Sequence, residues 1–226
     1  STAEALHLAC CNRMQSHAFI PDENPTRIDH AGFYRRWLSM IDDMEYLQSY
    51  VNCVSGTNEE DWVPLWRKAG KHYEKEGDKL ETEKKFKEAR ACFLQARTYY
   101  SIGRFPGAVS DIKKSISDDC NRAYAKSCAH LDPAVQEVII EHKGHQIKCH
   151  LRVPNTNGQH AAVLIMCGAD MFKEDRGWAG DFCLDNNMVA LIMDAPGTGD
   201  NLLPWEPASV SAWIAAVDYL AALPSV

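Results

Sequence analysis

The chain has 226 residues, 46% hydrophobic and 24% charged, which is ordinary for a globular protein with a sizeable core. Its formal net charge of −7 argues against a general nucleic-acid-binding protein, because no basic cluster could neutralise a phosphate backbone. No apolar run approaches the roughly 20 residues that a membrane-spanning helix needs, so we expect neither nucleic acid nor membrane as a partner.

The nine cysteines are scattered, with no Cys-x-x-Cys pair and no His/Cys spacing suited to zinc. Reduced thiols are therefore favoured over disulfides. The first residues lack a charged segment followed by an apolar core, so they do not resemble a signal peptide. We expect a cytoplasmic protein with no metal site and no cofactor.

Helical periodicity dominates the first half of the chain. Apolar side chains in residues 31–54 recur at spacings of three and four, which predicts one helix with a buried stripe. Asn58 is a suitable N-cap for a second helix, because Glu59 and Glu60 follow where the helix dipole favours anions. Gly77 is expected to end or bend that helix.

Two more helices are predicted before the chain changes character. The first covers residues 81–102, with Phe86 on its inward face and Gly103 as its stop. Val109 opens the apolar stripe of the second. Residues 1–132 are therefore predicted to form a helical domain.

After Pro133 the hydrophobic period changes from about 3.6 to about 2, which is typical of strands. Residues 135–141 and 146–153 predict an antiparallel hairpin, the second strand of which alternates as if one face were wet. Residues 163–166 and 188–193 are nearly unbroken apolar runs, as in parallel strands covered on both faces.

The last predicted element is a helix over residues 207–223 that packs on the sheet. Its inward stripe is expected to be Val210, Ile214, Val217, Leu220 and Ala221. The fold class is therefore α/β: a helical N-terminal domain, an antiparallel hairpin, and then parallel strands connected by helices.

A glycine turn follows each parallel strand. Cys167-Gly168-Ala169-Asp170 follows the first, and Asp194-Ala195-Pro196-Gly197-Thr198-Gly199 follows the second. Ligands bind at the carboxyl ends of parallel strands, so these turns are the predicted site. The side chain of Asp194 is expected to hold the turn that follows it.

These turns, the Lys173-Glu174 pair and the Arg104-Phe105-Pro106-Gly107 turn resemble the first half of an α/β-hydrolase. More narrowly, the chain is similar to serine hydrolases in which a helical cap precedes the catalytic domain. These are the FrsA-like esterases, the bacterial pseudooxynicotine C–C hydrolases, and the fungal hydrolases that shorten aromatic polyketides for pigments. The resemblance implies that residues 1–132 are the cap and residues 133–226 the N-terminal half of the hydrolase core.

The resemblance places an oxyanion hole at Gly168, Ala169 and Asp170. A backbone N–H aimed at the developing oxyanion typically stabilises it by ~3 kcal/mol. In such hydrolases one donor comes from the loop after the third strand. The Ala169 N–H is the first choice and the Asp170 N–H the second. The side chains of Asp170 and Glu174 either orient a substrate hydroxyl or stay solvated.

Aromatic residues at two places are candidates for binding the substrate. A cleft between cap and core is expected to be lined by residues that end the third predicted helix: Tyr99, Tyr100, Arg104 and Phe105. Arg104 would pair with a phenolate or carboxylate. The alternative is ordinary core with a surface arginine. Trp178 and Trp205 follow the two turns and either wall the pocket or cover the sheet.

The nucleophile of the family is missing from these residues. No Gly-x-Ser-x-Gly occurs in the chain, and no histidine follows Asp194. The family needs the serine, an acid and a histidine in that order. We therefore expect the chain to be the N-terminal part of a longer serine hydrolase, with its nucleophile beyond Val226.

By resemblance, that hydrolase cleaves a C–C or ester bond next to a carbonyl in a hydrophobic, aromatic polyketide-like substrate. Besides this small-molecule substrate, the expected partners are the C-terminal catalytic half and a second copy in a homodimer. Two alternatives stay open. One is a truncated pseudo-hydrolase that binds a ligand or a partner, and the other is a helical interaction module with an α/β scaffold.

Overall fold

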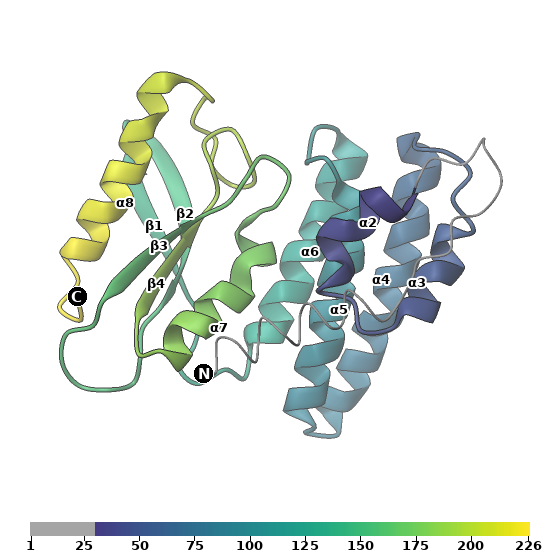
Figure 1. The fold of residues 1–226 in the computed structure, drawn as a ribbon, viewed down its shortest axis with the longest axis horizontal. Helices are drawn as coiled ribbons and strands as arrows, with labels where there is room; N and C mark the ends of the chain where they lie inside the picture. The colour runs from purple at the N-terminus through teal and green to yellow at the C-terminus, as the bar shows by residue number, and fades with distance from the viewer. Residues whose placement is uncertain (1–29) are drawn as a thin grey trace.

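The computed structural model of the protein describes residues 30–226, and the earlier part of the predicted helical domain lies outside the described residues. A bundle of helices stands beside a sheet, which carries further helices on its faces (Figure 1). The chain passes from helices to strands between Cys128 and Gln136. The α/β class predicted from the sequence is confirmed.

The bundle begins with two short helices where the sequence predicted one. α2 (His30–Leu38) ends before Asp43, and α3 (Met44–Val51) starts directly after it. The carboxylate of Asp43 accepts the backbone N–H of Tyr46 at 2.8 Å, so Asp43 caps a new helix. The prediction of a continuous helix over residues 31–54 is therefore wrong.

Three longer helices complete the bundle: α4 (Glu59–Thr82), α5 (Phe86–Arg104) and α6 (Asp111–Cys128). As predicted, Asn58 caps α4, its side chain accepting the N–H of Asp61 at 3.0 Å. Aromatic and aliphatic side chains share the centre of the bundle, and its largest fully buried side chains include Trp37, Trp66, Tyr34, Tyr99 and Tyr100.

Two glycines lie inside these helices because neighbouring side chains need the space. A Cβ at Gly77 would lie 2.6 Å from the ring of Phe93, and one at Gly103 would lie 3.0 Å from the Cβ of Trp66. Gly77 does not end α4, and α5 continues past Gly103 to Arg104. The ammonium group of Lys113 donates to the carbonyl of Gly103 at 2.9 Å, so this carbonyl in the last turn of α5 has a hydrogen-bond partner.

Two side chains assigned to buried stripes are exposed instead. Phe86 is 41% exposed and Val109 is 74% exposed, so both predictions are wrong. Phe86 opens α5 and stacks on His130, with ring centroids 4.0 Å apart. Val109 precedes the first residue of α6 and packs against nothing in the bundle core.

Within the described residues, the sheet has the strand order β1-β2-β4-β3. β1 (Gln136–His142) pairs antiparallel with β2 (His145–Arg152), and β2 pairs antiparallel with β4 (Val189–Met193). β3 (Ala162–Met166) runs parallel to β4. The predicted hairpin and parallel pair are confirmed, and β3 forms one edge of the described sheet.

One face of the sheet is covered by α7 (Gly177–Asp185), which lies between the sheet and the bundle (Figure 1). On this face Lys148 is exposed as predicted, but His150 is 7% exposed and Arg152 is 4% exposed, so the prediction of a wet face is wrong for the second half of β2. The ring of Tyr124, from α6, stacks on His150 at 5.0 Å. Arg152 pairs with Asp181 of α7 at 2.8 Å.

The opposite face of the sheet is covered by α8 (Ser211–Ala221), which follows the short 3₁₀ helix η2 (Pro207–Val210) (Figure 1). The side chains of α8 that are buried are Ala212, Ala216 and Leu220. Most of the predicted stripe is wrong, because three of its members are about half exposed: Val210, Ile214 and Val217. The helix thus packs through Ala212, Ala216 and Leu220, with Trp213 and Tyr219 partly buried beside them, and leaves Ile214 and Val217 outward.

Candidate active site

The loops after β3 and β4 lie at the same edge of the sheet, because these two strands are parallel. Residues 167–172, which we call the Ala169 loop, follow β3 and expose Gly168 and Ala169. Among residues 30–226, the N–H groups of Gly168, Ala169 and Asp170 have no protein acceptor. Exposed N–H groups of this kind can bind an anionic oxygen.

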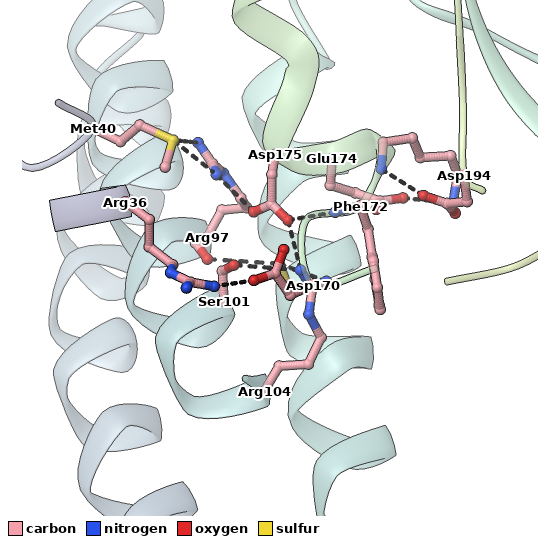
Figure 2. Close-up of polar contacts among 12 residues, drawn as sticks. Arg36, Met40, Arg97, Ser101, Arg104, Asp170, Phe172, Glu174, Asp175 and Asp194 are labelled. Atoms are coloured by element: carbon pink, nitrogen blue, oxygen red, sulfur yellow. Dashed lines mark hydrogen bonds and ion pairs between the residues drawn. The ribbon is translucent and has the colours of Figure 1, made fainter. Parts of the chain in front are cut away.

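Two carboxylates fix the end of the Ala169 loop. It runs into the 3₁₀ helix η1 (Lys173–Arg176), where Asp175 accepts the N–H of Phe172 at 2.8 Å (Figure 2). Asp194, at the end of β4, accepts the N–H of Lys173 at 2.7 Å. It also accepts the N–H of Asp200 at 3.1 Å, which confirms that its side chain holds the following turn.

Asp175 is completely buried and pairs with two arginines of α5. Its Oδ1 accepts from Arg97 at 2.9 Å and its Oδ2 from Arg104 at 2.6 Å. Burial raises the pKa of Asp175, but Arg104 and Arg97 outweigh it and lower the pKa to about 2. Asp175 is therefore ionised at neutral pH and joins helix α5 of the bundle to the loop.

Lys173 lies at the centre of a second group of buried charges. Its ammonium is 2.8 Å from Glu174, 3.3 Å from Asp194 and 2.7 Å from Asp200. Burial lowers the pKa of Lys173, but the three carboxylates outweigh it and raise the pKa above its usual value. Burial raises the pKa of Asp194, Lys173 opposes that change, and Glu174 adds to it.

Glu174 connects this group to the sheet. Its Oε1 lies 3.9 Å from Nε2 of His150, and burial lowers the pKa of that histidine. Its other oxygen, Oε2, is buried and has no hydrogen-bond partner among the described residues. The expectation that the Glu174 side chain orients a substrate hydroxyl stays a prediction, although a buried carboxylate oxygen has acceptor capacity to spare.

Comparison with known proteins identifies the family. Residues 37–224 match the family described as esterase FrsA-like. The chain belongs to the FrsA-like esterase family. It is 22% identical, over 172 residues, to 2,6-dihydropseudooxynicotine hydrolase of Paenarthrobacter nicotinovorans, a match that covers 73% of this chain and 44% of that protein.

Solved structures share the fold of this chain. The chain matches the crystal structure of the 2,6-dihydroxy-pseudo-oxynicotine hydrolase with a TM-score of 0.67 at 19% identity, covering 81% of this chain and 52% of that one. It matches wild-type AbyA5 with a TM-score of 0.68 at 18% identity, covering 86% and 52%. The chain thus spans about half the length of the proteins it matches.

Three candidate substrate residues of the helical bundle are enclosed by protein: Tyr99, Tyr100 and Arg104. Tyr99 stacks on Tyr73 with ring centroids 5.6 Å apart, and the hydroxyl of Tyr100 donates to Glu74 at 2.7 Å. The carboxylate that Arg104 pairs with in this chain is that of Asp175. Contact between these side chains and a substrate stays a prediction.

The other candidates lie nearer the surface. The ring of Phe105 packs edge-on against Trp37 at 5.6 Å and lies 4.5 Å below the guanidinium of Arg36. Trp178 is 58% exposed and Trp205 is 71% exposed, so both are accessible beside the two loops. The carboxylate of Asp170 is not simply solvated, because it forms an ion pair with Arg36 of α2 (Figure 2).

Sequence reasoning missed the residues that hold the loop: Arg36, Arg97, Lys173 and Asp175. One feature of the sequence could have indicated Arg97 and its carboxylate partner Asp175. Arg97 and Arg104 are seven residues apart, so they lie on the same face of α5 as the buried Phe93 and Tyr100. Two cations on the buried face of a helix require a buried carboxylate nearby.

Between residues 30 and 226, no group of three His, Cys, Asp or Glu side chains is arranged to hold a metal ion. In the same residues, no helix combines the length and the apolar character needed to cross a membrane.

Proposed function

We propose that this chain supplies the cap and the oxyanion loop of a serine hydrolase of the FrsA-like family. One observation carries the proposal: the adjacent N–H groups of Ala169 and Asp170 lie at the carboxyl end of β3 without an acceptor among residues 30–226. Attack on a carbonyl creates negative charge on oxygen, and each pre-aimed N–H stabilises it by ~3 kcal/mol. Ala169 is the first-choice donor, and Asp170 the second.

The attacking serine would belong to a C-terminal catalytic half of the same hydrolase. The proteins that this chain matches are about twice as long, and the chain has no Gly-x-Ser-x-Gly sequence. Two surfaces support such a partner. β3 is an edge strand in the described sheet, and exposed apolar side chains lie on η2 and α8: Val210 in η2, and Ile214 and Val217 in α8.

The substrate we infer is hydrophobic and polyketide-like, with an aromatic ring and a carbonyl next to the C–C or ester bond that is cleaved. Accessible tryptophans beside both loops, Trp178 and Trp205, support an aromatic ligand. Cleavage of a β-diketone side chain fits the oxyanion loop, because the departing carbanion is stabilised as an enolate. We place the reaction in the cytoplasm, since all the cysteines of residues 30–226 are free thiols.

The location of the nucleophile is tested by covalent labelling. A fluorophosphonate should label the hydrolase isolated from its native source at a serine outside residues 1–226, and should leave the 226-residue chain alone unlabelled. Intact-mass analysis of the native material would show whether the catalytic half is attached or co-purifies. Labelling of any serine within residues 1–226 would refute the proposal.

The oxyanion role is tested at the first-choice donor. Ala169→Pro removes the N–H, and Ala169→Gly keeps it, so the second variant is the matched control. In the hydrolase that contains both halves, Ala169→Pro should lower kcat for a p-nitrophenyl ester by ~10²–10³-fold with little change in KM. Equal kcat for the two variants would contradict the role of Ala169. A native protein that binds aromatic ligands without any turnover would instead support a pseudo-hydrolase.

A further inference from the structure

We propose that Arg97 and Arg104 of the cap are positioning residues that act through Asp175 to hold the Ala169 loop in its N–H-presenting conformation. This inference rests on the proposed function of the loop. It gives the cap a part in the chemistry beyond shaping the pocket, and it assigns Arg104 a partner within the protein.

The contacts converge on one oxygen atom. Oδ2 of Asp175 accepts both the Arg104 guanidinium at 2.6 Å and the backbone N–H of Phe172 at 2.8 Å (Figure 2). Oδ1 accepts Arg97 at 2.9 Å, which fixes the rotation of the carboxylate. The position of α5 is therefore transmitted to a backbone group three residues from Ala169.

Arg104 makes a second contact with the same loop residue. Its guanidinium carbon lies 3.8 Å from the centre of the Phe172 ring. The side chain and the amide of Phe172 are thus both held by one arginine. Arg104 itself is oriented from within α5 by Ser101, whose hydroxyl accepts at 3.3 Å.

The cap holds the other side of the loop as well. Arg36 of α2 forms an ion pair with Asp170, the residue after Ala169 (Figure 2). The guanidinium of Arg36 also lies over the ring of Phe105. Cations from α2 and α5 therefore act on the loop at Asp170 and, two residues later, at Phe172. Buried ion pairs are weak evidence for stability, so the geometric effect on the loop is the better explanation for burying Arg97, Arg104 and Asp175.

The same helix provides a matched control. Arg90 of α5 pairs with Asp181 of α7 at 2.6 Å, which is also an ion pair between the bundle and the sheet side. Asp181 accepts from Arg90 and Arg152 and makes no hydrogen bond to the Ala169 loop. Breaking the Arg90 pair loosens the same junction without touching the loop.

The test compares Arg97→Met, Arg97→Lys and Arg90→Met. Arg97→Met leaves Asp175 balanced by Arg104, so the variant retains a neutral buried pair. Asp175→Ala is avoided, because it would leave two buried guanidinium groups without a counter-charge. Each variant is studied in the 226-residue chain and in the hydrolase with both halves, at temperatures equally far below its own Tm.

The first readout is amide hydrogen exchange, which needs no activity. Arg97→Met should speed exchange of the Phe172 N–H by ~10-fold, since its acceptor is no longer fixed, and Arg97→Lys should recover part of the protection. Exchange of Leu191 in β4 serves as the internal reference. Arg90→Met should leave Phe172 exchange within twofold of the unchanged protein.

The second readout is ester turnover. Arg97→Met should lower kcat by ~10-fold or more with KM nearly unchanged, and Arg90→Met should change neither. Unchanged Phe172 exchange in Arg97→Met, with only a lower Tm, would overturn the positioning role. If Ala169→Pro also leaves turnover intact, the proposed function fails, whereas the exchange experiment still decides whether the arginines hold the loop.

Discussion

Asp194 accepts the backbone N–H of Lys173 at 2.7 Å, so the residue that ends β4 also fixes the loop that follows β3. The same carboxylate accepts the N–H of Asp200 at 3.1 Å, which ties in the second loop. Gly199 passes so close to this carboxylate, with φ of +53°, that a Cβ there would collide with it. One side chain therefore sets the relative position of both loops of the candidate site.

Replacing Asp194 by alanine should destabilise the chain by about 3 kcal/mol, because a buried and a part-buried N–H group lose their acceptor and the Lys173 ammonium loses one of its carboxylate partners. This loss of stability is near the low end for breaking a buried ion pair, because the Lys173 ammonium still pairs with Glu174 and Asp200. Urea unfolding measures the change. Asp185→Ala, at the exposed end of α7, is the control and should cost less than ~0.5 kcal/mol.

The junction between bundle and sheet depends on a glycine. A Cβ at Gly177 would lie 2.7 Å from the ring of Tyr124, the side chain that also stacks on His150. Gly177→Ala should therefore lower stability by roughly 1–3 kcal/mol through overpacking, measured by thermal unfolding. In contrast, Gly168→Ala should be neutral, because the nearest atom to its Cβ would be 3.9 Å away. Equal Tm values for the two variants would show that Tyr124 can move aside.

The strands and the site loops could be predicted from the sequence because their signals are local. The apolar run of β4 and the glycine turns beside it need no distant partner to be recognised. The contacts that hold the Ala169 loop could not be predicted. Arg97 and Asp175 are separated by 78 positions, and charge runs such as the one containing Asp175 are usually solvated.

The buried faces of helices were predicted wrongly for a different physical reason. α8 is apolar on nearly every side, so periodicity alone allows more than one buried stripe. The sequence favoured the face with larger side chains, but the sheet is packed by Ala212 and Ala216, whose small size allows close approach. The break before α3 was missed because the apolar spacing continues across it, and only the cap by Asp43 marks the boundary.

The stability of the bundle is expected to depend on pH through the carboxyl group of Glu74. Burial raises the pKa of this carboxyl, but hydrogen bonds from Arg122, Tyr100 and Lys126 outweigh it and lower the pKa to about 2. Because the folded-state pKa lies below the unfolded value of 4.5, Glu74 contributes stability above about pH 4.5 and loses it as the pH falls toward 2.

Glu74→Gln should therefore cost roughly 1–2 kcal/mol at pH 6, a discounted value because Arg122 is 46% exposed and partly screened. The difference from the unchanged protein should shrink steadily between pH 5 and pH 3, as followed by urea unfolding. Glu76→Gln, an exposed change on the same helix, is the control variant. A difference that stays constant with pH would mean that Glu74 contributes through packing instead of charge.

Variants on the outward face of α8 distinguish an effect on the folding stability of this chain from an effect on its association with a partner. Ile214 is 58% exposed, so Ile214→Glu should change the stability of the 226-residue chain by less than ~0.5 kcal/mol. Ala216 faces the sheet and is completely buried, so Ala216→Leu should cost roughly 1–3 kcal/mol by overpacking.

If the catalytic half covers α8, Ile214→Glu should weaken its association with this chain by at least about tenfold, because a charge would be buried at the contact. Analytical ultracentrifugation or calorimetry with the separately expressed half measures that affinity. Asp218→Asn, an exposed change on the same helix, is the matched surface control. Unchanged affinity of Ile214→Glu would place the catalytic half elsewhere, and a large loss of stability in the isolated chain would mean that Ile214 is already covered there.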